Sequence, residues 1–115
     1  MENINLEDVR NSIDQVDSEL MKLLSKRFEL TEKVGIYKAA NNLMAQDTIR
    51  ESEKFDKLIL LSEKNGLNSE YALKIFRCIM DMAISRHQEI QGGIRGTETS
   101  NGQPDVGTGN LTPHS

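Results

Sequence analysis

The stretch LEDVRNSIDQVDSELMKLLSKRFELTEKVGIYKAA, from Leu6 to Ala40, decides the fold of this chain. Its apolar residues recur at alternating spacings of four and three, which is typical of a long helix that packs along other helices. We call this row the apolar seam; it comprises Val9, Ile13, Val16, Leu20, Leu23, Leu30, Val34 and Tyr37. Acidic residues open the stretch, where the helix dipole favours them, and it contains no proline. The sequence therefore predicts one helix over 6–40, capped by Asn3 or Asn5.

Two residues inside this helix depart from the pattern. Arg27 stands where the seam calls for an apolar side chain. Because burying a guanidinium without an anionic partner is costly, Arg27 either pairs with an internal acid or faces a cavity that receives an anion. Gly35 weakens a helix by roughly 1 kcal/mol relative to alanine. At an ordinary position such a glycine is only tolerated, whereas at a close helix crossing it lets a backbone or a ligand approach.

The composition favours a single all-α domain. The chain has 115 residues, of which 37% are apolar and 4% aromatic, with no tryptophan. A β-sandwich would need more aromatic and β-branched residues at a period of two. The net charge of −4 is small, and no run of basic residues suggests nucleic acid as a partner.

The single cysteine and the first residues argue against a disulfide-bonded, thiolate-metal, exported or membrane-spanning protein. Cys78 has no second cysteine for a disulfide or a thiolate metal site, and it lies in an apolar helical run, so we expect a buried, inert thiol. The opening MENINLEDVR has neither the basic nor the apolar region of an export signal, and no apolar run reaches the length of a membrane span. We therefore expect a cytoplasmic protein with no membrane contact.

Two more helices and a tail follow the first helix. Asp47 is a good N-cap for a helix over about 48–65, which ends at Asn65-Gly66. Asn68 can cap a third helix over about 69–91. Residues 92–115 carry six of the eight glycines and both prolines and have few apolar side chains. We therefore predict a helical domain over 1–91 and a disordered tail over 92–115.

The length of the first helix predicts a dimer. At 1.5 Å per residue, 35 residues span about 52 Å. A globule of 91 residues is only about 25–30 Å across. The economical way to cover the seam is to intertwine two chains, so we expect an obligate homodimer with no stable folded monomer.

The helical positions of the cations predict an anion site. Arg27 and Lys38 are eleven residues apart and share one face of the helix, about 16 Å apart along its axis. Both side chains are long enough to lean toward one small anion between them. Arg10 lies on a different face and about 25 Å from Arg27, so it could serve only the site of a partner chain.

The second and third helices add acids, a further arginine and a histidine. Asp47 and Glu51 share one face of the second helix, with Arg50 between them, and His87 lies on an apolar face of the third. Each has a structural alternative: Asp47 caps the helix, Glu51 complements its dipole, Arg50 is solvated, and His87 packs in the core. No metal site, P-loop, GxGxxG motif or nucleophile elbow is present. The residues favour a site that binds a small, multiply anionic molecule and holds its shape.

The combined spacing of these residues resembles the all-α chorismate mutases of the AroQ class. The pattern is Arg10-x2-Ile13-x3-Asp17-x2-Leu20-x2-Leu23-Leu24-x2-Arg27, then Val34-Gly35-x2-Lys38, then Asp47-x2-Arg50-Glu51. The resemblance covers about residues 6–90. It implies three helices per chain in an intertwined dimer with two shared active sites, and the Claisen rearrangement of chorismate to prephenate in phenylalanine and tyrosine biosynthesis, with no cofactor.

The resemblance also implies roles for individual residues. Arg10 of the partner chain and Arg27 would bind the two carboxylates of the substrate. Lys38 would bind a carboxylate and the ether oxygen that gains charge as the C–O bond breaks. Asp47 and Glu51 would orient the ring hydroxyl, and Arg50 would support the site or touch the substrate.

Two positions on the third helix depart from the pattern of the family. Ala83 stands where many members have serine, so a hydroxyl contact to a carboxylate is missing or supplied elsewhere. His87 stands where many members have glutamine as a second donor to the ether oxygen, and Gln88 follows it. Since one residue turns a helix by about 100°, the two cannot face the site equally, and we favour His87.

Other functions remain open at the level of the sequence. Relatives with the same fold eliminate pyruvate from isochorismate or rearrange an amino analogue of chorismate. A non-catalytic helical dimerisation module would also explain the seam, although not the cations in it. No fused enzyme domain is evident, so the chain resembles a small monofunctional mutase, and docking to another enzyme of the shikimate pathway is neither indicated nor excluded.

Overall fold

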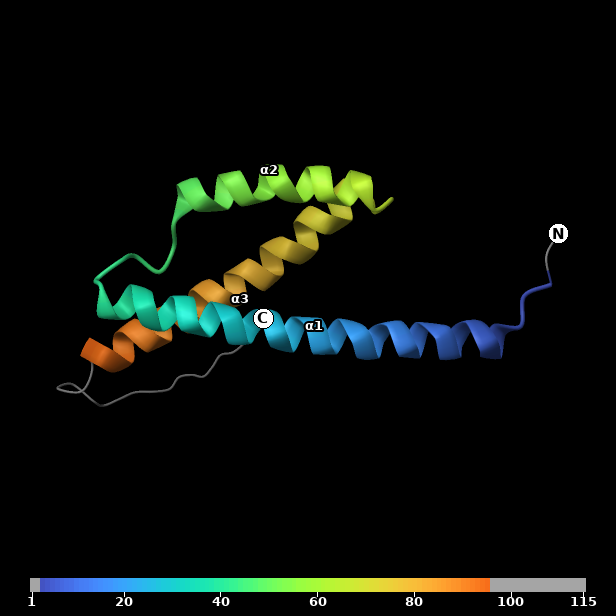
Figure 1. The fold of residues 1–115 in the computed structure, drawn as a ribbon, viewed down its shortest axis with the longest axis horizontal. Helices are drawn as coiled ribbons and strands as arrows, with labels where there is room; N and C mark the ends of the chain where they lie inside the picture. The colour runs from blue at the N-terminus through green and yellow to red at the C-terminus, as the bar shows by residue number, and fades with distance from the viewer. Residues whose placement is uncertain (1–2, 96–115) are drawn as a thin grey trace. The chain divides into compact units, whose positions relative to one another are not determined.

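Three α-helices make up the described part of the chain, residues 3–95 of a computed structural model (Figure 1). They are α1 (Leu6–Ala40), α2 (Thr48–Lys64) and α3 (Ser69–Arg95), and no strand occurs within residues 3–95. The predicted all-α class and the starts of all three helices are confirmed. The chain divides between Thr31 and Glu32 into two compact units, and each is described by itself.

The first unit consists of the beginning of α1 and the residues before it. Oδ1 of Asn5 accepts hydrogen bonds from the backbone N–H groups of Glu7 at 3.0 Å and Asp8 at 3.2 Å. Asn5, rather than Asn3, is therefore the side chain that caps the helix. The dipole of α1 favours the same two acids in its first turn.

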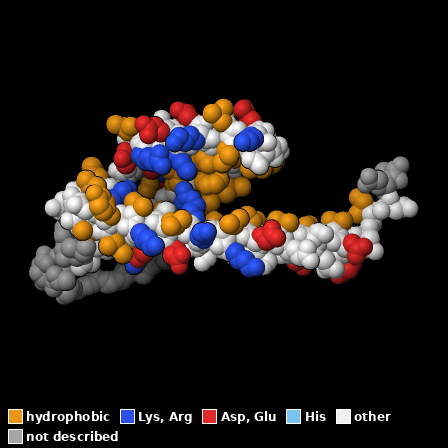
Figure 2. All heavy atoms as spheres, in the orientation of Figure 1, with side chains coloured by type: hydrophobic (Ala, Val, Ile, Leu, Met, Phe, Trp, Pro, Cys, Tyr) orange, Lys and Arg blue, Asp and Glu red, His pale blue; other side chains and the backbone are white. Residues whose placement is uncertain are grey.

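The apolar seam is exposed to solvent in the single chain. Val9 is 42% exposed, Ile13 is 51% and Leu23 is 65%, and Leu30, Val34 and Tyr37 are exposed as well. Figure 2 shows apolar side chains along one side of α1. Burying such side chains is favourable by about 25 cal/mol for each Å² removed from water, so a long apolar row left in water indicates a surface for another helix.

The second unit is built on the packing of α2 against α3. Its buried apolar residues come from the loop and from both helices: Ala45, Leu58, Ala72, Ile79 and Ala83. Buried Ser62 donates to the carbonyl of Ile59 at 2.7 Å and lies 3.0 Å from the hydroxyl of Ser69. Both hydroxyl groups are thus satisfied where the two helices meet.

The turn between α2 and α3 forms as the sequence predicts. Gly66 has a φ of +68°, in the left-handed region that glycine adopts without strain. The N–H of Leu67 donates to the carbonyl of Ser62 at 2.8 Å, which closes the end of α2. Asn68 then caps α3 by accepting from the N–H of Tyr71 at 3.1 Å.

The end of α1 crosses α3 within the second unit. Gly35 is buried, and a Cβ atom at this position would lie 2.5 Å from Cδ2 of His87 and 3.0 Å from Cδ1 of Ile90. The close helix crossing suggested for Gly35 is therefore present. Arg86 of α3 also donates two hydrogen bonds, of 2.9 and 2.8 Å, to the carboxylate of Glu32 of α1.

Helix α3 runs to Arg95 instead of ending at residue 91. Glycine disfavours a helix by about 1 kcal/mol but does not forbid one, and contacts near the end of α3 anchor it. Nε2 of Gln91 donates to the carbonyl of Leu43 at 2.6 Å, and Ile90 packs at Gly35. The rest of the predicted disordered tail, 96–115, lies outside the described residues.

Cys78 is exposed, so the expectation of a buried thiol is wrong for the single chain. The neighbouring Ile79 is the buried residue of that turn. Because one residue rotates a helix by about 100°, burial of Ile79 turns Cys78 toward solvent. An apolar run in the sequence therefore did not identify which of its members faces the core.

Candidate active site

The second unit joins the end of α1, the loop over 41–47, the start of α2 and the middle of α3 through a chain of contacts. Gly35 of α1 meets His87 of α3, and Lys38 of α1 meets Ala45 of the loop. Glu51 of α2 meets both the loop and α3. This is the region in which the sequence predicts a site.

A hydrogen bond from its ammonium group holds the side chain of Lys38 against the loop. Its Nζ donates to the carbonyl of Ala45 at 3.1 Å, and the side chain is half-buried. The N–H of Leu43 donates to the carbonyl of Lys38 at 2.8 Å, and Asn42 takes a positive φ of 57° in the same turn. An ammonium has three donors, so Lys38 can hold Ala45 and still donate to an anion.

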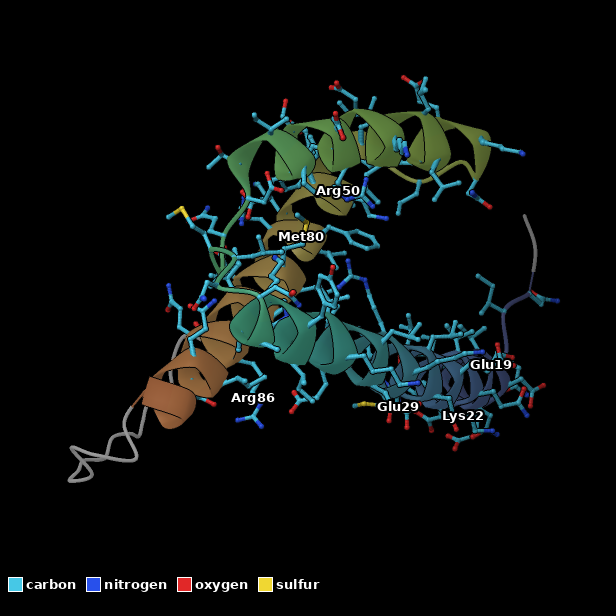
Figure 3. All side chains as sticks on the ribbon, turned by 60° about the vertical axis from the view of Figure 1, so that its left-hand side comes forward. Glu19, Lys22, Glu29, Arg50, Met80 and Arg86 are labelled. Carbon is cyan, nitrogen blue, oxygen red and sulfur yellow. The ribbon has the colours of Figure 1, made fainter. Side chains whose placement is uncertain are left out.

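Asp47 performs the capping role that the sequence offers as the structural alternative. Its Oδ1 accepts from the backbone N–H of Arg50 at 3.0 Å, and its backbone is extended, as an N-cap requires. The side chain of Arg50 is exposed and projects from the beginning of α2 (Figure 3). The cap thus fixes where α2 begins and the positions from which the side chains of Arg50 and Glu51 project.

Glu51 does more than complement the dipole of α2. Its side chain is only 13% exposed, and its two oxygens accept from Nη1 and Nη2 of Arg77 at 3.3 and 3.2 Å. Nε2 of Gln46 lies 3.2 and 3.4 Å from the same oxygens. Hydrogen bonds from Arg77 lower the pKa of Glu51, with Gln46 adding to the effect, while burial and the charge of Asp47 oppose it. Glu51 is therefore an ionised acceptor at the start of α2.

Arg77 is a contact residue of Glu51 that the sequence did not predict. The side chain also binds Asp81, through Nε at 2.9 Å and Nη2 at 2.7 Å, and lies 5.3 Å from the centroid of the Phe55 ring. The only signals in the sequence were the spacing of Arg77 and Asp81 by four residues and the position of Arg77 next to Phe76 on the apolar face. Neither signal points to Glu51.

His87 and Gln88 face different surroundings, as their rotation about α3 requires. His87 is buried, with its ring against Gly35: a Cβ there would lie 3.0 Å from Nε2. Gln88 lines a cavity of about 500 Å³ with Gln91 and residues 42–46 of the loop. Ala83, one turn before His87, is buried. His87 and Ala83 therefore share the inner face of α3, and Gln88 does not.

Arg10 and Arg27 belong to the first unit. Arg10 is exposed, whereas Arg27 is half-buried, and its burial lowers the pKa of the guanidinium. Their approach to Lys38 and Glu51 stays a prediction.

Residues 3–95 contain neither a membrane-spanning helix nor a metal-binding cluster. No helix in this part of the chain is long and apolar enough to cross a membrane. The same residues hold no group of three or more histidine, cysteine or acidic side chains placed to bind a metal ion.

Comparison with known proteins identifies the family. Residues 9–88 match the family described as chorismate mutase type II. The chain is 32% identical over 81 residues to the bifunctional chorismate mutase/prephenate dehydratase of Buchnera aphidicola subsp. Acyrthosiphon pisum, covering 70% of this chain and 21% of that protein. It is 30% identical over 98 residues to the Aquifex aeolicus protein of the same name, covering 83% of this chain and 27% of that protein.

A shorter relative matches over most of its length. The chain is 25% identical over 76 residues to the chorismate mutase of Methanocaldococcus jannaschii, covering 66% of this chain and 77% of that protein. By contrast, the chain spans only about a fifth to a quarter of the bifunctional relatives. Since the family match covers well over half of the residues, the chain belongs to the chorismate mutase type II family.

Proposed function

We propose that this chain catalyses the rearrangement of chorismate to prephenate. The observation that carries the proposal is that one compact unit contains both a cationic donor and an ionised acceptor. Lys38 presents its ammonium beside the loop, and Glu51 presents a carboxylate at the start of α2. Both residues lie inside the segment that matches the family.

The reaction needs nothing that this set of residues lacks. It is unimolecular and pericyclic, so no acid, base, nucleophile or cofactor is obligatory. The rate can come from holding the reactive conformer and from donors aimed at the oxygen that gains charge. Lys38 would donate to that ether oxygen and to a carboxylate, while Glu51 would accept from the ring hydroxyl.

The two arginines of the first unit would complete the site. Arg27 would bind one carboxylate of the substrate, and Arg10 of the partner chain would bind the other, because a planar guanidinium matches a carboxylate in two-point contact. In this proposal the exposed apolar seam is the interface of an intertwined homodimer. Asp47 would set the position of Glu51 through its cap, and Arg50 would support the site from α2.

His87 would supply the second donor to the ether oxygen, with Ala83 beside it on the inner face of α3. Either form of an imidazole can donate a hydrogen bond. Its packing against Gly35 supports a fixed orientation. His87→Gln keeps a donor and His87→Ala removes it, so kcat should be largely retained in the first variant and lost in the second. Equal kcat values in the two would mean that the ring serves packing alone.

The proposed function is tested by following the loss of chorismate and the formation of prephenate with purified protein. Arg27→Leu should abolish turnover while the fold survives or becomes more stable, since the change removes a partly buried charge from the seam. Lys26→Leu is the matched control, because Lys26 is exposed and adjacent. An active Arg27→Leu protein, or faster turnover of isochorismate than of chorismate, would overturn the proposal.

A further inference from the structure

Glu51 of α2 and Arg77 of α3 form an ion pair that joins the two helices at the candidate site. Nη1 of Arg77 reaches Oε1 of Glu51 at 3.3 Å, and Nη2 reaches Oε2 at 3.2 Å. Two nitrogens therefore meet two different oxygens. Such a two-point contact fixes the plane of the carboxylate as well as its position.

Arg77 is itself held in place from two other directions. Its Nε donates to Oδ1 of Asp81 at 2.9 Å, and Nη2 lies 2.7 Å from the same oxygen. The guanidinium also lies over the ring of Phe55, 5.3 Å from its centroid. Arg77 thus presents a fixed fork to Glu51, and little rotamer freedom remains to be lost when a ligand binds.

A ligand can donate to Glu51 by displacing the amide of Gln46. An ionised carboxylate has about four acceptor positions, and Arg77 occupies one on each oxygen. The amide of Gln46, an exposed loop residue, spans both oxygens at 3.2 and 3.4 Å. Because the side chain of Glu51 is only 13% exposed, little of its surface is open to a ligand.

We propose that Arg77 is a positioning residue, which holds the carboxylate of Glu51 in the orientation that accepts the ring hydroxyl of the substrate. This role rests on the proposed function, since that function gives Glu51 a hydroxyl to bind. A simple tie between α2 and α3 is the competing explanation. The interface already buries Leu58, Ile79 and Ala83, so the fold should survive replacement of Arg77 by glutamine, an uncharged polar residue.

The pH profile separates the two explanations. The charged groups that face Glu51 are Arg77 from α3 and Asp47 from the start of α2, and the first lowers its pKa while the second opposes this. If the carboxylate must be ionised to accept the hydroxyl, activity falls as the pH falls through the lowered pKa. Loss of Arg77 raises that pKa, so the acid limb of the profile should move to higher pH.

The experiment measures kcat, KM and thermal unfolding for Arg77→Gln, Glu51→Gln and the double variant, with chorismate as substrate, across acidic to neutral pH. The control is Arg86→Gln, because Arg86 makes a similar two-point pair on the same helix with Glu32 instead. Arg77→Gln should lower kcat/KM about tenfold, mainly through KM, because a hydroxyl contact is made in both ground and transition states. The loss should vanish in the Glu51→Gln background.

Each alternative outcome has a defined meaning. Equal kcat/KM for Arg77→Gln and Arg86→Gln, a full additional loss in the Glu51→Gln background, or an unmoved acid limb would each overturn the positioning role. A wild-type protein that does not convert chorismate would instead contradict the proposed function. If Arg77→Gln fails to fold, Arg77→Lys keeps the charge without the two-point contact and should recover only part of kcat/KM.

Discussion

Gly35 is the residue whose identity depends most directly on a neighbour. In an exposed helix, replacing glycine with alanine stabilises by roughly 1 kcal/mol. At Gly35 the added Cβ would lie 2.5 Å from Cδ2 of His87, closer than real contacts allow. The ring would have to move, and overpacking of this kind costs about 1–3 kcal/mol. Gly35→Ala should therefore lower the melting temperature and displace a donor proposed for the site.

A second glycine provides the matched control. Gly92 is also helical, and nothing lies within 4 Å of the position its Cβ would take. Gly92→Ala should leave activity unchanged and keep or raise stability. The clash is with His87, so His87→Ala should relieve the destabilisation when it is combined with Gly35→Ala. A Gly35→Ala protein as stable and active as the wild type would show that the crossing is looser than the structure indicates.

For individual residues, the sequence predicts contacts made within one helix better than contacts made between helices. The cap at Asp47 could be predicted because it acts on the first turn of its own helix, whereas the contact of Lys38 with Ala45 of the loop was not foreseen. Arg77 escaped prediction because its partner lies on another helix, and residue spacing says nothing about how two helices are rotated against each other. The exposure of Cys78 escaped for the same reason.

An ion pair whose strength varies with pH joins α1 and α3 at their crossing. Arg86 donates to Glu32 at 2.9 and 2.8 Å and to Glu89 at 3.1 Å. Hydrogen bonds from Arg86 lower the pKa of Glu32. The stabilisation is therefore complete above the ordinary glutamate pKa of about 4.3 and is lost as the pH falls through the lowered value.

Arg86→Gln tests this dependence by thermal unfolding at a fixed protein concentration. The variant should melt below the wild type at neutral pH, by a small margin because the pair is exposed. The two melting curves should converge in acid, where Glu32 is protonated in both proteins. A difference that persists at low pH would mean that Arg86 stabilises the crossing through the packing of its side chain.

Helix boundaries could be predicted where local chemistry sets them. Asn5, Asp47, Asn68 and Gly66 act through their own backbone neighbours, and each boundary lies where the sequence indicates. The end of α3 differs, because contacts from Ile90 and Gln91 to distant residues outweigh the cost of two glycines. Tertiary contacts of this kind leave no local signal.

The apolar seam of α1 is uncovered in the single chain. Five of its residues, Val9, Ile13, Val16, Leu20 and Leu23, are 42–65% exposed in the single chain. A second copy offers an identical seam, and a two-fold interface pairs such a surface with itself. The proposed dimer would bury the seam and bring Arg10 of one chain to the site of the other.

This arrangement predicts complementation between two inactive variants. Arg10→Ala and Lys38→Ala should each lose activity alone, since every site of each homodimer lacks one cation. When the two are unfolded and refolded together in equal amounts, half of the dimers should be mixed. Each mixed dimer then holds one intact site and one doubly damaged site. Activity should return to about one quarter of that of the wild type.

The mixing experiment shows whether Arg10 serves the site of its own chain or that of the partner chain, which the loss of activity in one variant cannot show. If Arg10 served the site of its own chain, both sites of a mixed dimer would stay damaged and no activity would return. Sedimentation of the same mixture shows whether dimers formed, so a failure to assemble is separated from a failure to share. A chain that sediments as a monomer and is still active would refute the shared site. Ile13→Glu places a charge in the seam; it should give monomers without activity, because a monomer has no partner to donate Arg10.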